Sequence, residues 1–86
     1  MNPGLAGQAA LVTGAGRGIG AAIAREFAGA GCDVALVEFG AFDEAQALAD
    51  EIRRSGRRAV AIRADVADVG TADQAVATAI QTFGRL

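Results

Sequence analysis

Residues 13–20 of this chain read TGAGRGIG, and this glycine-rich segment decides the fold. It follows the apolar run AALV at residues 9–12 and precedes a stretch with helical spacing that extends to about Ala30. Glycines allow positive φ angles and let backbone N–H groups approach a ligand closely, while the start of a helix favours an anion. The segment therefore predicts a turn, between a buried strand and a helix, that binds the phosphates of a dinucleotide.

The rest of the chain alternates between apolar strand patterns and helical patterns. Strands are expected at residues 8–13, 33–38 and 59–63, and helices at residues 18–30, 43–54 and 71–83. Three βα units in this order predict a parallel sheet with right-handed crossovers, in the spatial order 3-2-1. The first two helices should cover one face, and the third should cross to the other face, where a fourth strand would pair beside the first. The expected fold class is α/β, a three-layer Rossmann-type βαβαβα half without the fourth and later strands.

Local patterns also predict where helices begin and which apolar residues line them. Asp43 with Gln46, and Thr71 with Gln74, have the spacing of capping boxes and mark expected helix starts. Asp68 is expected to be a turn or helix-start residue. The stripes of apolar residues are Ile19, Ile23 and Phe27 in the first helix, Ala45, Leu48, Ala49 and Ile52 in the second, and Val76, Ile80 and Phe83 in the third.

Composition excludes several classes of function. The 86 residues are 52% hydrophobic and 21% charged with a net charge of −2, which indicates a globular protein without the basic surface that nucleic acid requires. There is no histidine for metal binding, and Cys32 is expected to be buried and unreactive because no base is available to activate it. Without a signal peptide or an apolar run of about 20 residues, the expected location is cytoplasmic, away from membranes. The arginines within residues 53–58 are interpreted as cations near a helix C-terminus rather than as a phosphate or partner site.

The spacing of the glycines shows which of the known phosphate-binding motifs this segment matches. A Walker A loop needs a lysine after its last glycine, and this chain contains no lysine. The common Gly-x-Gly-x-x-Gly form fails from Gly14, because Ile19 stands in the third position, and from Gly16 only its alanine-ending variant fits. The pattern Thr-Gly-x-x-x-Gly-x-Gly matches completely, at Thr13, Gly14, Gly18 and Gly20.

This complete pattern resembles that of the short-chain dehydrogenase/reductase family in its ordinary branch. Arg17 breaks the Gly-x-x-Gly-x-x-Gly spacing of the extended branch. The resemblance covers about residues 5–86, and it includes Glu38 at the end of the second strand and the pair Asp65-Val66 after the third. It implies that residues 1–86 are the N-terminal part of a single NAD(P)-binding Rossmann domain.

The resemblance also implies a role for each glycine position of the cofactor site. Gly14 allows the sharp turn out of the strand, and the backbone N–H of Ile19 donates to the cofactor phosphates. Gly18 and Gly20 keep side chains away from the pyrophosphate and from the contact between helix and sheet. Together with Arg17, these four residues are the expected pyrophosphate site.

The adenosine half of the cofactor is expected to meet the ends of the second and third strands. A carboxylate at Glu38 can accept both ribose hydroxyl protons and would repel a 2′-phosphate, which favours NAD over NADP. Arg17 points towards NADP, but Phe39 follows Glu38 in place of an arginine that could bind the phosphate, so NAD is the preferred cofactor. By resemblance, Asp65 accepts from the adenine amino group and the backbone N–H of Val66 donates to the ring.

Catalytic residues are missing from this sequence. Reductases of the family use a Tyr-x-x-x-Lys pair together with a Ser and an Asn, and the chain contains neither tyrosine nor lysine. The segment alone is therefore predicted to be inactive, with no catalytic or metal-binding residue. We interpret it as the cofactor-binding part of a longer, homo-oligomeric oxidoreductase that transfers hydride between a nicotinamide cofactor and an alcohol or carbonyl substrate. The alternative is a non-catalytic nucleotide-binding or partner-binding module, complete as written.

Overall fold

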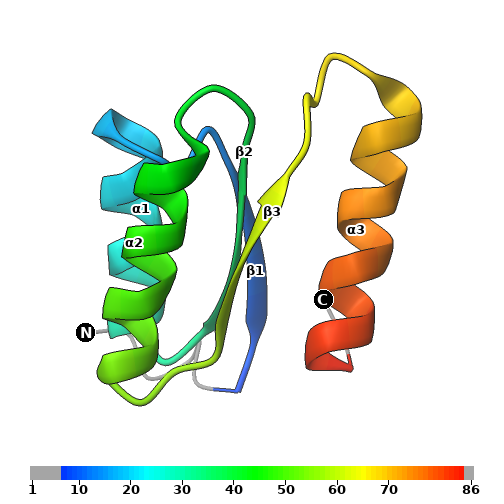
Figure 1. Cartoon of the computed structure of the whole chain (residues 1–86). Coiled ribbons are helices and arrows are strands. Elements are labelled where there is room, and N and C mark those ends of the chain that lie inside the picture. The colour runs from blue at the N-terminus through cyan, green and yellow to red at the C-terminus, as the bar shows by residue number, and fades with distance from the viewer. Residues whose placement is uncertain (1–6, 85–86) are drawn as a thin grey trace.

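The computed structural model describes residues 7–84, in which three strands alternate with three helices (Figure 1). The elements are β1 (Ala9–Thr13), α1 (Gly18–Gly29), β2 (Asp33–Glu38), α2 (Phe42–Arg54), β3 (Ala59–Arg63) and α3 (Val69–Phe83). Every strand and helix that the sequence predicts is present, and their boundaries differ from the prediction by one or two residues at most.

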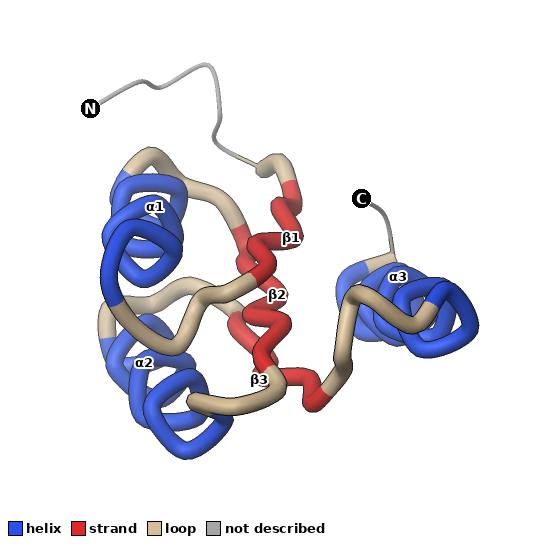
Figure 2. The backbone as a smooth tube through the Cα atoms, turned by 90° about the horizontal axis from the view of Figure 1, so that it is seen from above, coloured by secondary structure: helices blue, strands red, loops and turns tan. Residues whose placement is uncertain are grey.

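The three strands form one parallel sheet in the order β1-β2-β3. Leu11 of β1 lies opposite Ala35 of β2, and Val37 of β2 lies opposite Ile62 of β3. Helices α1 and α2 lie on one face of the sheet and α3 lies on the other, as the view from above shows (Figure 2). The predicted strand order and the crossing of the third helix are thus confirmed, and the segment is half of a Rossmann-type fold.

The central strand, β2, forms the middle of the core. Residues 34–37 are at most 1% exposed, because helices cover this strand on both faces of the sheet. On one face, Leu36 belongs to the cluster that α1 and α2 build with the sheet. On the other face, Ala35 packs against Ala79 and Phe83 of α3. Burial on both sides explains why this strand is a continuous apolar run.

Helix α1 packs on the sheet mainly through alanines, and Phe27 is the one larger apolar residue of its expected stripe that joins them. Ala21, Ala24 and Ala28 are buried, whereas Ile19 is 80% exposed and Ile23 is 42% exposed. Of the stripe of large residues expected from the sequence, Ile19 and Ile23 are exposed, and only Phe27, which is half-buried, packs against the core. A helix that approaches a sheet closely has room for only small side chains at the contact, so side-chain size is a poor guide to burial here.

The expected apolar stripe is partly wrong in α3 and correct in α2. In α3, Ala75, Ala79 and Phe83 are buried, but Val76 and Ile80 are exposed, so only Phe83 of the expected stripe packs on the sheet. The helix again presents its alanines to the strands. In α2, the expected stripe is confirmed, because its four apolar residues are all buried: Ala45, Leu48, Ala49 and Ile52.

Both helix starts that were expected from capping boxes are different in the structure. Helix α2 begins at Phe42 after Ala41, which has no side chain able to cap it, and Asp43 lies in the first turn. Helix α3 begins at Val69, because the Asp68 carboxylate accepts from the backbone N–H of Gly70 at 3.0 Å. Asp68 is thus the N-cap of α3, which confirms its expected place at the helix start.

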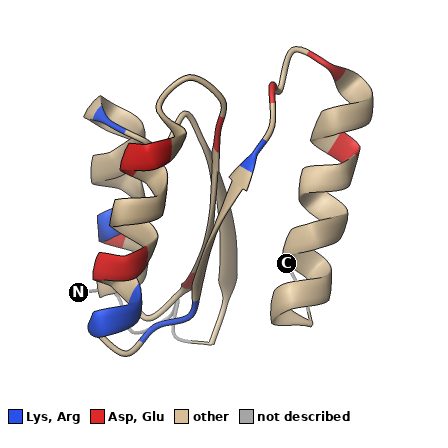
Figure 3. Ribbon diagram, viewed as in Figure 1, with Lys and Arg blue, Asp and Glu red and all other residues tan. Residues whose placement is uncertain are grey.

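The arginines near the end of α2 make contacts within the protein. Arg53 Nε donates to the Ala59 carbonyl at 2.9 Å, and its Nη1 lies 2.6 Å from Asp50 Oδ1. Arg58 forms an ion pair with Asp33 at the start of β2. These positive charges gather at the lower end of α2 and in the loop that follows it, whereas α3 is almost free of charge (Figure 3). Contacts within the chain therefore account for Arg53 and Arg58. Cys32 is 1% exposed, as expected.

Candidate functional site

The glycine-rich turn lies at the carboxyl edge of the sheet, the upper edge in Figure 1. Gly14 and Gly18 have φ angles of 63° and 62°, a backbone conformation in which any side chain would be strained. A Cβ atom on either residue would meet nothing within 4 Å, so bare backbone borders open space on this side of the turn. This is the arrangement that the motif predicts for contact with a ligand.

At Gly20, unlike at Gly14 and Gly18, a side chain is excluded by lack of space. A Cβ atom there would run into the carbonyl oxygen of Gly14 and would lie 2.7 Å from the Gly14 carbonyl carbon and 3.2 Å from Ala15 Cα. The missing side chain allows the first turn of α1 to rest directly on the glycine-rich turn. Gly20 thus positions the start of α1 against the turn.

The N-terminus of α1 is open in the described part of the chain. Arg17 is the N-cap residue in an extended conformation, and it makes no side-chain hydrogen bond to the helix start. The first turn of α1 also contains no acidic residue. The backbone N–H groups there, among them that of Ile19, can therefore bind an anion in the favourable field of the helix.

Glu38 binds to the glycine-rich turn and to its own following loop. Its Oε1 accepts from the backbone N–H of Gly16 at 2.8 Å, and its Oε2 accepts from those of Phe39 at 3.1 Å and Ala41 at 3.2 Å. The bond from Gly16, followed by that from Ala41, holds the pKa of Glu38 below its ordinary value, and the positive charge of Arg17 adds to this effect. The carboxylate is therefore ionised at neutral pH.

The acceptor capacity of Glu38 limits what else it can bind. An ionised carboxylate has about four acceptor positions, and three backbone N–H groups fill three of them. One position remains, on Oε1. One ribose hydroxyl can donate to it directly, whereas a second would have to displace a backbone N–H group.

The third strand brings Asp65 and Val66 to the same edge. Asp65 Oδ1 accepts from the backbone N–H of Ala67 at 3.0 Å, which fixes the carboxylate on its loop. Val66 is 51% exposed. Both residues follow β3, which lies next to the strand that ends in Glu38. The structure thus brings Glu38 into contact with the glycine-rich turn and places Asp65 and Val66 beyond the end of the neighbouring strand.

Two features of this edge were not predicted from the sequence. Gly16 and Ala41 bind Glu38, although neither is a required position of the motif Thr-Gly-x-x-x-Gly-x-Gly. The Arg63 guanidinium lies 4.6 Å from the centre of the Phe42 ring, at the start of α2. The contacts of Gly16 with Glu38 and of Arg63 with Phe42 join residues more than 20 positions apart, so no local sequence pattern pointed to them.

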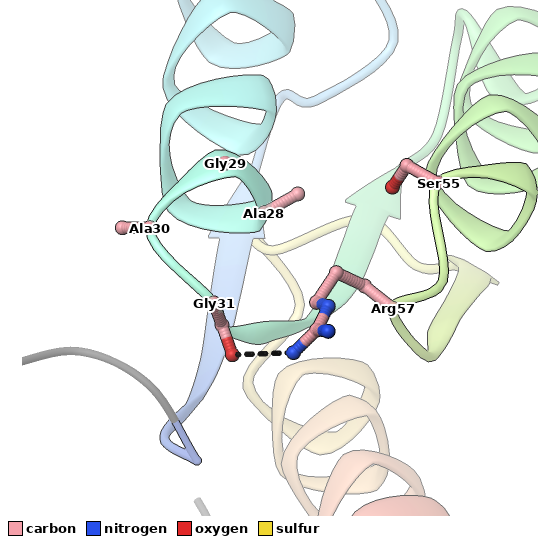
Figure 4. A pocket seen from close by; sticks show the side chains of 6 residues that line it. All are labelled: Ala28, Gly29, Ala30, Gly31, Ser55 and Arg57. Carbon is pink, nitrogen blue, oxygen red and sulfur yellow. Dashed lines mark hydrogen bonds between the residues drawn. The ribbon is translucent and has the colours of Figure 1, made fainter. Parts of the chain in front are cut away.

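A surface pocket of about 320 Å³ lies at the opposite edge of the sheet, where α1 and α2 end (Figure 4). Arg57 points across it and donates to the Gly31 carbonyl at 3.4 Å. Its lining is mostly small side chains and backbone, from Ala28, Gly29, Ala30, Gly31, Ser55 and Arg57. It is far from the glycine-rich turn along both helices, so it is separate from the phosphate site.

Two kinds of feature are absent from residues 7–84. None of the helices there is both long and apolar enough to cross a membrane. In the same range, no three His, Cys, Asp or Glu side chains are grouped so that they could hold a metal ion.

Comparison with known families assigns the chain to one of them. Residues 8–86 match the family model described as short chain dehydrogenase. The chain belongs to the short-chain dehydrogenase family. Among proteins of known sequence, it is 49% identical over 82 residues to the hydroxynaphthalene reductase-like protein Arp2 of Metarhizium guizhouense, covering 95% of this chain and 31% of that protein. It is 45% identical over 82 residues to the oxidoreductase UcpA of Salmonella typhimurium, covering 95% and 30%. The chain thus spans slightly less than a third of the relatives' length.

Solved structures of similar proteins contain the same half-fold. A blue fluorescent protein from a metagenomic library, in complex with NADPH, is 46% identical with a TM-score of 0.90, covering 93% of this chain and 33% of that one. A short chain dehydrogenase from Burkholderia cenocepacia in complex with NADP is 48% identical with a TM-score of 0.90 and the same coverage. An enzyme from Burkholderia phymatum in complex with NAD is 27% identical with a TM-score of 0.89, covering 95% and 29%.

Proposed function

We propose that this segment binds the adenosine and pyrophosphate part of a nicotinamide dinucleotide in an NAD(P)-dependent short-chain oxidoreductase. The observation that carries the proposal is the open backbone at Gly14, in the turn, and at Gly18, the first residue of a helix whose N-terminus has no side-chain cap. A Cβ atom at either glycine would occupy this open space. The similar structures in complex with NADPH, NADP and NAD support the same class of ligand.

Each part of the cofactor has proposed partners in this chain. The backbone of the glycine-rich turn and the N–H of Ile19 would hold the pyrophosphate, with Arg17 beside it. Glu38 would accept from a ribose hydroxyl through the free position on Oε1. The adenine would meet Asp65 and the N–H of Val66. When bound, the nicotinamide ring would donate a hydride to the substrate or accept one from it, and a longer protein would supply the substrate site and the residue that transfers the proton.

We further propose that NAD is preferred over NADP. Glu38 is ionised and held at its position by three backbone N–H groups. A 2′-phosphate at the same ribose would place like charges next to each other, which costs free energy. Arg17 is the nearby positive charge that acts in the opposite direction.

The substrate class is proposed on the relatives' names alone. Arp2 is named as reductase-like and UcpA as an oxidoreductase, which fits an alcohol or carbonyl substrate. The alternative, from a different class of function, is a nucleotide-binding module without catalysis. Oxidation of NADH or NADPH by the full-length protein with a panel of ketones and aldehydes separates the two: turnover supports the enzyme, and binding without turnover supports the module.

Direct binding tests the cofactor proposal. Calorimetric titration of the full-length protein with NAD and with NADP should give a lower Kd for NAD. Glu38→Ala should raise the relative affinity for NADP, whereas Glu26→Ala, which removes a charge from the exposed side of α1, should leave the ratio of the two Kd values unchanged. Tighter binding of NADP than of NAD by the wild-type protein would overturn the preference, and binding of neither would overturn the site.

A further inference from the structure

The glycine-rich turn and the loop after β2 touch at Gly16. This residue is buried, and it is not one of the four positions that the motif Thr-Gly-x-x-x-Gly-x-Gly requires. Its backbone N–H donates to Glu38 Oε1 at 2.8 Å, which is the shortest of the three hydrogen bonds to that carboxylate. Gly16 thus connects the proposed phosphate end of the site to the proposed ribose end.

No side chain fits at Gly16. A Cβ atom there would run into the carbonyl oxygen of Ala41 and would lie 2.7 Å from Ala41 Cβ and 2.9 Å from Glu38 Oε1. Ala41 is only 3% exposed and meets Gly16 through its carbonyl oxygen and its Cβ atom, neither of which is a flexible end that could move aside. Gly16 is also absent from the glycines with positive φ, so the requirement comes from space and not from backbone conformation.

Gly40 provides a matched comparison within the same contact region. It lies in the loop between Glu38 and Ala41, and its φ is likewise not positive. A Cβ atom on Gly40 would meet nothing within 4 Å. The same substitution, glycine to alanine, is therefore blocked at Gly16 and free at Gly40.

We propose that Gly16 is a positioning residue for cofactor choice, because it holds the Glu38 carboxylate at the place where a 2′-phosphate would lie. This inference rests on the proposed binding of a nicotinamide dinucleotide. A glutamate side chain whose carboxylate makes no hydrogen bonds can rotate away from a phosphate at little cost in free energy. A glutamate bound by three N–H groups loses those bonds if it rotates, and hydrogen bonds to charged groups are the stronger ones.

The test compares two single substitutions in the full-length protein. The Kd values for NAD and NADP are measured by calorimetric titration for wild type, Gly16→Ala and Gly40→Ala. We expect Gly16→Ala to lower the ratio Kd(NADP)/Kd(NAD) by about tenfold, since one charged hydrogen bond is lost and the carboxylate is displaced. Gly40→Ala should leave the ratio as in the wild type.

The same substitution in Glu38→Ala protein distinguishes a positioning role of Gly16 from a general loss of structure. In Glu38→Ala protein, Gly16→Ala should leave the ratio unchanged, because the carboxylate through which it acts is gone. A purely structural role would weaken the binding of both cofactors by the same factor, with or without Glu38. That equal weakening would overturn the inference while the proposed dinucleotide site stands, whereas a wild-type protein that binds neither cofactor would overturn both.

A measurement on folded protein covers the case in which Gly16→Ala does not fold. The amide proton of Gly16 should resonate downfield in wild-type protein, because it donates to a carboxylate, and Glu38→Gln should move it upfield. The amide proton of Gly40, which lies in the same loop as the carboxylate's other partners, is the internal reference. An unchanged Gly16 resonance in Glu38→Gln protein would show that the bond does not hold the carboxylate, and would overturn the inference.

Discussion

Arg58 and Asp33 join the start of β2 to the segment that leads into β3. Arg58 Nη2 lies 2.9 Å from Asp33 Oδ2, and the backbone N–H of Arg58 donates to Asp33 Oδ1 at 3.0 Å. The same guanidinium lies 5.5 Å from the centre of the Phe83 ring and donates to the Phe83 carbonyl at 3.3 Å. A single side chain thus connects the amino-terminal edge of the sheet to the end of α3.

Replacement of Arg58 by alanine should lower the free energy of unfolding by about 1 kcal/mol. The effect is modest because the guanidinium is 56% exposed, so water screens the ion pair. Urea denaturation of the purified protein measures it. Arg57→Ala is the control, since Arg57 makes a longer contact of 3.4 Å to the Gly31 carbonyl. Equal losses for the two variants would contradict the role given to Arg58.

Replacement of Gly20 by alanine should destabilise the fold by about 2 kcal/mol, because the added methyl group collides with the backbone of Gly14. Gly29→Ala is the matched control within the same helix. A Cβ atom there meets nothing within 4 Å, and alanine suits a helix better than glycine does, so stability should rise or stay the same. If Gly20→Ala and Gly29→Ala both lowered the urea midpoint, the collision at Gly20 would not explain the loss of stability.

The order of the elements could be predicted because it depends on local patterns. The apolar run of β2, the glycines at the turn and the stripe of α2 each lie within one short stretch of chain, and all of them are found as expected. The start of α3 shows where local patterns compete. Thr71 and Asp68 are both good caps, and only the fold decides that the carboxylate of Asp68 accepts from the backbone.

The packed faces and the contacts of Glu38 could not be predicted in the same way. Ala24 is fully buried while Ile19 is exposed, since the distance between α1 and the sheet, rather than hydrophobicity, selects the side chain. The bond from Gly16 to Glu38 joins residues that are 22 positions apart, and neither residue's neighbours indicate it. Such contacts depend on how two loops meet at the sheet edge.

Glu38 should make stability depend on pH. Its pKa in the folded protein lies below the value of about 4.5 for an unperturbed carboxyl, chiefly because the Gly16 and Ala41 amides bind the ionised form. Its stabilising contribution is therefore complete above about pH 4.5 and is lost as pH falls through the folded-state pKa. The gap in unfolding free energy between wild type and Glu38→Gln should then be largest at pH 7 and should shrink towards pH 3 in urea denaturation. Glu26→Gln, which removes an exposed carboxylate from α1, is the control for the loss of one carboxylate, and a constant gap for Glu38→Gln would disprove the expected linkage.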